Sequence, residues 1–267
     1  MKQLLYTLFL GLMLFSCKSE VKKETISETD YTKETLDVTT SIYPENISKV
    51  FEAHGGLDNW NQMQSLAFTM TKPTGKEVTT VNLKSRESVI TTPNHTLGFD
   101  GKDVWLDTKN KEEYQGNPKF YYNLMFYFHT MPFVLADNGI NYEVAKPLSF
   151  EGVEYPGIKI SYDSGVGASS DDEYVLYYNP TSFKMEWLAY TVTFNSKAKS
   201  EQWSFIKYSN WHTIEGLVLP ETLTWYLVED NLPVKKRNDL QFTNVTLSKQ
   251  SLAASTFAKP ETAVVVE

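Results

Sequence analysis

Apolar and polar residues alternate along most of the chain after residue 64, which is the pattern of strands with one buried face. The first alternating runs are 65–71, 78–90 and 96–106, and Asp100-Gly101, a hairpin-turn dipeptide, interrupts the third. A second series occupies 142–144, 153–162, 174–178, 184–194, 202–208, 217–219, 222–229 and 238–247. Many strands joined by short turns, with no helix between them, predict an antiparallel sheet large enough to curl.

The period is helical before residue 65. The positions Ile47, Val50, Phe51 and His54 follow the i, i+3, i+4, i+7 spacing of one helix face. We therefore predict a helix over 44–54 that begins at Pro44 and is stopped by Gly55-Gly56. A second short helix is predicted to begin at Asp58 and to carry Trp60 and Met63.

The segment Phe120 to Leu135 breaks the strand pattern, because it is apolar nearly all round and follows Asn117-Pro118, a helix-start signal. A helix that is apolar on every side must be buried on every side, or lie against lipid or a ligand. We predict a core helix or a lid, kinked or split at Pro132. The fold class is mainly β (α+β): a curved antiparallel sheet, or incomplete β-barrel, with helices in or over its concave face.

The N-terminus has the form of a lipoprotein signal. Lys2 precedes an almost uninterrupted apolar run at 4–15, and Ser16 precedes Cys17, the only cysteine of the chain. The run is shorter than the roughly 20 residues of a transmembrane helix, so it predicts a secretory signal at 1–16 and lipidation of Cys17. The alternative is an ordinary signal peptide followed by an incidental cysteine.

Residues 18–40 are rich in Lys, Glu, Thr and Ser and show no period. Such a segment buries too little surface to offset its ordering entropy. We therefore expect 17–40 to be a lipidated, disordered tether and 41–267 to be a single half-barrel domain. The expected location is the cell envelope, anchored by lipid at the outer membrane, on either its periplasmic or its surface face.

Net charge and composition limit the classes of partner that we expect. The net charge of −8 and the pI near 5.2 exclude a nucleic-acid partner from our expectation, and we interpret the one basic run, 235–237, as a solvated hairpin end. Aromatic residues make up 14% of the chain. That excess is explained either by a β-rich core or by an aromatic-lined cavity.

No catalytic motif is present in the sequence, and the only thiol lies at the anchor. The histidines are scattered and are interpreted as surface or capping residues, with a zinc site assembled from distant positions as the alternative: His54, His95, His129 and His212. The acidic, glycine-containing stretch 163–173 is interpreted as a solvated connection, since its spacing matches no defined calcium loop. We expect no enzymatic activity, no metal and no cofactor.

Two stretches carry a resemblance to known families. Residues 44–54, ending in His54-Gly55-Gly56 and followed by Trp60 and 65–68, resemble the entry motif of an uncharacterised lipoprotein family of Gram-negative bacteria. The succession 177–185, 205–208 and 215–220 is similar to that of the LolA/LolB-like lipoprotein carrier and receptor group. The likeness covers most of 44–250, and it implies an incomplete β-barrel closed by helices around an apolar cavity that holds acyl chains.

The favoured hypothesis is a lipid-anchored envelope protein that binds an apolar or amphiphilic ligand, a lipid or lipoprotein acyl chains, in a half-barrel cavity. Its candidate ligand-binding residues lie on the apolar segment: Phe120, Tyr121, Phe126, Phe128 and Phe133. The alternative is a non-enzymatic binding or assembly module with a filled core that acts through its surface. An enzyme is the third and least favoured hypothesis.

Overall fold

The computed structural model describes residues 42–109, 112–163, 171–194 and 199–267. The chain divides into two units, Met1–Thr40 and Ser41–Glu267, and the described residues belong to the second. The expected signal peptide, Cys17 and the tether therefore lie outside the described residues, as does most of the acidic stretch 163–173. The lipidation of Cys17 and the domain boundaries stay predictions.

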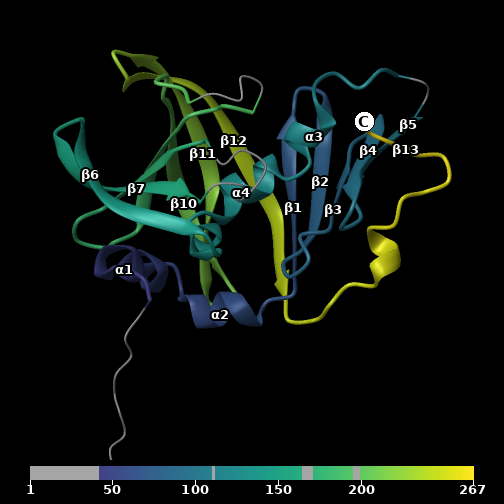
Figure 1. The fold of residues 1–267 in the computed structure, drawn as a ribbon, viewed down its shortest axis with the longest axis horizontal. Helices are drawn as coiled ribbons and strands as arrows, with labels where there is room; N and C mark the ends of the chain where they lie inside the picture. Colours follow the sequence, from purple (N-terminus) through teal and green to yellow (C-terminus); the bar gives the residue numbers. More distant parts are fainter. Residues whose placement is uncertain (1–41, 110–111, 164–170, 195–198) are drawn as a thin grey trace, which may run out of the picture. The chain divides into compact units, whose positions relative to one another are not determined.

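Within the described residues the strands form one antiparallel sheet of 13 strands, in the order β13-β5-β4-β3-β2-β1-β12-β11-β10-β9-β8-β7-β6. Its edge strands β13 and β6 do not pair with each other, so the sheet is open, and it curves around the helix α4 (Figure 1). This confirms the predicted mainly β class. The strands are β1 Ser65–Lys72, β2 Gly75–Asn82, β3 Ser88–Thr91, β4 His95–Phe99, β5 Val104–Thr108, β6 Ile140–Phe150, β7 Val153–Tyr162, β8 Tyr174–Tyr178, β9 Met185–Tyr190, β10 Ser204–Ile214, β11 Leu217–Glu229, β12 Leu232–Ser248 and β13 Val264–Val265.

The expectation of one continuous run at 78–90 is wrong, because the chain turns between β2 and β3. The side-chain oxygen of Asn82 accepts hydrogen bonds from the backbone N–H groups of Lys84 and Ser85, at 2.9 and 3.2 Å. An asparagine side chain that accepts hydrogen bonds from the backbone two and three residues later stabilises a turn, and this turn ends the strand. Arg86 then adopts a left-handed conformation, with φ of 65°.

The long strand β12 joins the two halves of the sheet. Up to Gln241 it pairs with β11, where Gln241 faces Thr222. From Phe242 onward it pairs with β1, where Phe242 faces Met70. Residues 217–221 of β11 therefore have no β12 partner, and the two halves part along a seam between these strands.

The helices are α1 Glu45–Ala53, α2 Leu57–Gln62, α3 Pro118–Tyr121, α4 Leu124–Thr130 and the 3₁₀ helices η2 Phe133–Ala136 and η3 Ala254–Thr256. The predicted glycine stop of α1 is confirmed: Gly55 has φ of +101°, and a Cβ there would lie 2.2 Å from the carbonyl oxygen of Gly216. The missing side chain lets the end of α1 approach the β10–β11 turn.

The apolar segment 120–135 is split at Pro132, as predicted, but it is also interrupted at Asn123, between α3 and α4. Asparagine is a poor interior helix residue, so a single helix was the wrong expectation. Buried side chains of α4 and η2 share one core with both halves of the sheet. The helices therefore lie over the concave face, as expected (Figure 1). In the described ranges, no helix has both the length and the apolar character needed to cross a bilayer.

Candidate functional site

A cavity of about 290 Å³ lies between the helical segment and strands β7 and β8. One wall is the helical segment and the other carries Tyr162 of β7 and Tyr174 of β8. Apolar and aromatic side chains dominate, and five of the lining residues carry a charged or amide side chain. The lining residues are Lys119, Phe120, Asn123, Leu124, Tyr127, Phe128, Met131, Val134, Asp137, Asn138, Tyr162, Asp172, Tyr174 and Phe194.

The two carboxylates of the cavity are both engaged by the protein. One Nη of Arg86 donates to both carboxylate oxygens of Asp137, each at 2.8 Å. Asp172 accepts from the backbone N–H and the hydroxyl of Thr193, at 2.6 and 2.7 Å. Burial raises the pKa of Asp137 and of Asp172 above the ordinary value in spite of these partners. The side chain of Asp137 is 43% exposed, so solvent screens it, whereas Asp172 is only 8% exposed, which strengthens electrostatic effects around it.

The five aromatic residues predicted as ligand contacts separate into two groups. Phe120 and Phe128 line the cavity. Tyr121 instead donates its hydroxyl to Glu77 Oε1 at 2.7 Å and lies beside Lys72. Phe126 lies under the guanidinium of Arg86, and Phe133 stacks on Trp60 with ring centroids 4.7 Å apart, so Tyr121, Phe126 and Phe133 are not part of the lining.

Sequence reasoning missed the opposite wall of the cavity. Tyr162, Tyr174 and Phe194 come from three different places in the chain, and only the folded sheet brings them to the helical segment. A local signal existed for one of them. Ile158, Ile160 and Tyr162 alternate on the inward face of β7, so Tyr162 was readable as an inward residue at the end of a strand.

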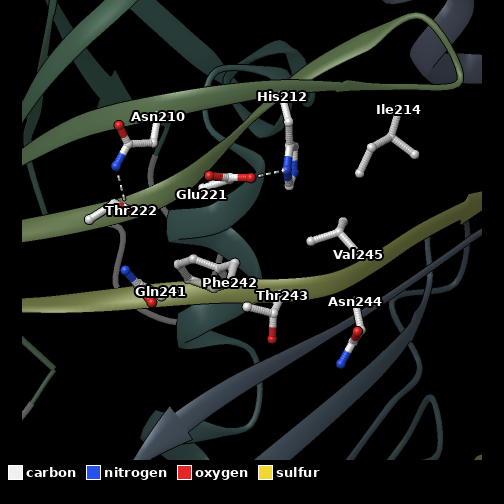
Figure 2. A pocket seen from close by; sticks show the side chains of 10 residues that line it. All are labelled: Asn210, His212, Ile214, Glu221, Thr222, Gln241, Phe242, Thr243, Asn244 and Val245. Atoms are coloured by element: carbon white, nitrogen blue, oxygen red, sulfur yellow. Dashed lines mark hydrogen bonds and ion pairs between the residues drawn. The ribbon is translucent and has the colours of Figure 1, made fainter.

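A second hollow, of about 420 Å³, lies in the seam between β11 and β12 (Figure 2). Seven of its ten lining residues are polar. Figure 2 shows His212 Nδ1 paired with Glu221 Oε1, at 3.2 Å, and the Asn210 amide donating to Thr222 Oγ1, at 3.1 Å. Glu221 places a carboxylate in this hollow, which opposes a purely apolar ligand. The lining residues are Asn210, His212, Ile214, Glu221, Thr222, Gln241, Phe242, Thr243, Asn244 and Val245.

The histidines correct one expectation. His54 is a capping residue as predicted: it ends α1, its Nδ1 donates to the carbonyl of Val218 at 3.0 Å, and its Nε2 accepts from the N–H of Met185 at 3.0 Å. His129 is wrongly predicted as surface or capping, because it is fully buried and stacks on Phe242 at 4.1 Å. Burial lowers the pKa of His54 to about 4 and that of His129 to about 3.

Across the described part of the chain, no three His, Cys, Asp or Glu side chains converge in a way that would hold a metal ion.

Comparison with known proteins places the chain in a family. Residues 3–237 match a family of unknown function, DUF6503. The chain belongs to this family. No curated protein matches it, and the family description assigns no enzymatic activity.

Three solved structures are similar to the fold. A LolA superfamily protein from Nitrosomonas europaea shares 11% identity over 76% of this chain and 96% of its own, with a TM-score of 0.44. A DUF1329 family protein from Desulfovibrio piger shares 10% identity over 80% and 98%, with a TM-score of 0.47. A putative outer membrane lipoprotein-sorting protein domain from Vibrio parahaemolyticus shares 7% over 75% and 93%, with a TM-score of 0.37.

Proposed function

We propose that this protein is a non-enzymatic envelope protein that holds the apolar part of a lipid or other amphiphile in the 290 Å³ cavity beside α3 and α4. The observation that carries the proposal is the lining of this cavity, in which aromatic and aliphatic side chains surround a small number of polar groups. Cavities of this composition and approximate size are typical of sites for small apolar ligands. The membrane is the natural source of such a ligand.

Phe120 is the clearest ligand contact among the lining residues. It is half-buried and belongs to the four-residue helix α3, which adds no buried side chain to the core. Its ring faces that of Phe194 across a centroid distance of 5.2 Å. A phenylalanine that contributes little to the core but lines a cavity is available to bury its free face against a guest.

Phe120→Ala is expected to weaken binding of the neutral fluorescent probe N-phenyl-1-naphthylamine about fivefold to tenfold, since the variant removes apolar contact area worth about 1 kcal/mol or more. Phe150→Ala is the matched control: Phe150 is also half-buried, but it packs on Trp187 away from the cavity. Fluorescence titration of the full chain measures both. Equal losses in the two variants would contradict the assignment of Phe120.

A second candidate function rests on how fully the concave face is packed. Phe133, Val134 and Leu135 of η2 are at most 2% exposed, so the core beneath the helices is filled and the cavity is confined to one side. If the wild-type chain binds no apolar probe, the protein is better described as a binding or assembly module that acts through its surface.

We further propose that Cys17 carries the lipid that anchors the protein at the outer membrane. One acyl chain anchors only marginally and two anchor stably, so stable attachment requires diacylation. Cys17→Ala is expected to move the protein out of the membrane fraction or to leave the signal uncleaved, while Ser16→Ala, which keeps a small residue before the cysteine, leaves fractionation unchanged. A cleaved Cys17→Ala protein that still fractionates with membranes would rule the anchor out.

A further inference from the structure

We propose that three tyrosines and a buried aspartate in the cavity wall select an amphiphile with a hydroxyl-bearing head group and discriminate against an ionised carboxylate. The inference rests on the proposed function, because it concerns the head group of the ligand whose apolar part the cavity holds. It is carried by three tyrosines and one buried aspartate on the cavity wall.

The three tyrosines are Tyr127 of α4, Tyr162 of β7 and Tyr174 of β8, all of which line the cavity. The rings of Tyr162 and Tyr174 meet edge to face at 5.9 Å. None of the three hydroxyls has a hydrogen-bond partner among the described residues, and none is sealed in the core. Polar groups on an enclosed wall are normally satisfied by water or by a ligand, so these hydroxyls are available to a guest.

Burial raises the pKa of all three phenols, which therefore stay neutral and keep a proton to donate. The electrostatic influence of Asp172 contributes to the raised pKa of Tyr162 and of Tyr174. Tyr162, Tyr174 and Asp172 line the same cavity, and the two rings are in contact, so these three residues form one polar cluster.

Asp172 determines the sign of the charge at this cluster. Its side chain is 8% exposed, and only one of its two carboxylate oxygens is used, by the two bonds from Thr193. No Lys or Arg pairs with it among the described residues, whereas Asp137 is neutralised by Arg86. The one cationic residue of the lining, Lys119, is exposed and its charge is screened by solvent.

A hydroxyl group suits this arrangement because it both accepts and donates. It accepts from a tyrosine O–H and donates to the free oxygen of Asp172. An ionised carboxylate has no proton to donate and is repelled by the buried carboxylate of Asp172. A glycerol or sugar head group meets the requirement, and a fatty-acid anion does not.

The experiment compares two ligands with the same ten-carbon chain, 1-monodecanoylglycerol and decanoate, as competitors of N-phenyl-1-naphthylamine bound to the full chain at pH 7.5. The expected result is that the glyceride displaces the probe at a concentration at least about tenfold lower than decanoate does. Asp172→Asn, which keeps the oxygen that bonds Thr193, is expected to bring the two ligands closer by strengthening decanoate binding.

Tyr174→Phe should weaken glyceride binding about threefold to tenfold, the loss of one hydrogen bond. The matched control is Tyr178→Phe, because Tyr178 stacks on Phe183 and does not line the cavity. Melting temperatures verify that each variant folds. Probe binding combined with equal or better displacement by decanoate overturns the head-group selection and leaves the proposed function standing, whereas no probe binding by the wild type overturns the proposed function and this inference with it.

Discussion

Phe133→Ala is expected to lower the free energy of unfolding by about 3–5 kcal/mol, the cost of truncating a buried phenylalanine. Phe133 is 1% exposed, and its ring stacks on Trp60 of α2 with an interplanar angle of 8°. It also meets His54 at the end of α1, at a centroid distance of 6.3 Å. One side chain thus joins η2 to both N-terminal helices, and its loss leaves a cavity that none of them can close alone.

Urea unfolding of the full chain measures this loss, and Phe120→Ala is the control from the same apolar segment. The control is expected to cost less than about 1 kcal/mol, since Phe120 is half-buried and lines the cavity. Phe133→Ala should leave the affinity for the fluorescent probe within about twofold of the wild type. Similar stability losses in both variants would contradict the assignment of Phe133 to the core and of Phe120 to the cavity wall.

Lowering the pH from 7 to 5.5 is expected to reduce the free energy of unfolding by about 2.5 kcal/mol through His54 and His129 together. The pKa values of these residues are lowered to about 4 and about 3, and in the unfolded chain both return to the ordinary value of 6.5. Below that value the unfolded state binds protons that the native state does not. Their stabilising effect is therefore complete above pH 6.5 and is lost as the pH falls toward the native values.

Protonation of the two histidines destabilises the native state for different structural reasons. In the neutral ring, Nε2 of His54 accepts a hydrogen bond from the backbone N–H of Met185. Protonation of Nε2 would remove this acceptor and place two N–H groups against each other. His129 has no partner for either ring nitrogen among the described residues, so its charge would be buried and uncompensated. The test stops at pH 5.5 because Asp137 and Asp172, whose pKa values are raised, take up protons in the native state and oppose the trend at lower pH.

His129→Phe isolates one of these contributions, because it keeps an aromatic ring against Phe242 and removes the titrating group. The variant is expected to halve the pH dependence and to be as stable as the wild type at pH 7, or more so, since it removes an unsatisfied buried polar group. Denaturant titrations at pH 7 and 5.5 measure both quantities. An unchanged pH dependence in the variant would contradict the burial of a neutral His129.

Local features of the chain were sufficient to predict the class of the fold. Alternation identifies a strand from its own residues, and a turn dipeptide such as Asp100-Gly101 marks where it ends; the side chain of Asp100 indeed accepts from the backbone N–H of Asp103 at 2.8 Å. The partner switch in β12 has no comparable signal. Gln241 and Phe242 belong to one continuous alternating run, and the choice of β11 or β1 depends on strands far away in the sequence.

The site was only half predictable for the same reason. Phe120 and Phe128 belong to a segment whose apolar character is visible in the sequence, but Tyr162 and Tyr174 face them only after the sheet has formed. The burial of His129 was within reach. A segment that is apolar nearly all round is expected to be buried on every side. His129 lies within such a segment, so the same reasoning predicts that His129 is buried.

Native mass spectrometry of the full chain, purified in mild detergent, tests most directly whether the cavity holds an apolar guest. The comparison is between the wild type, Leu124→Trp, which fills the cavity from α4, and Leu232→Trp, a control at an exposed position of β12. The account predicts a lipid adduct on the wild type and on Leu232→Trp that is lost or strongly reduced in Leu124→Trp. An adduct that persists when the cavity is filled, or a wild type with no adduct after exposure to lipid, would contradict it.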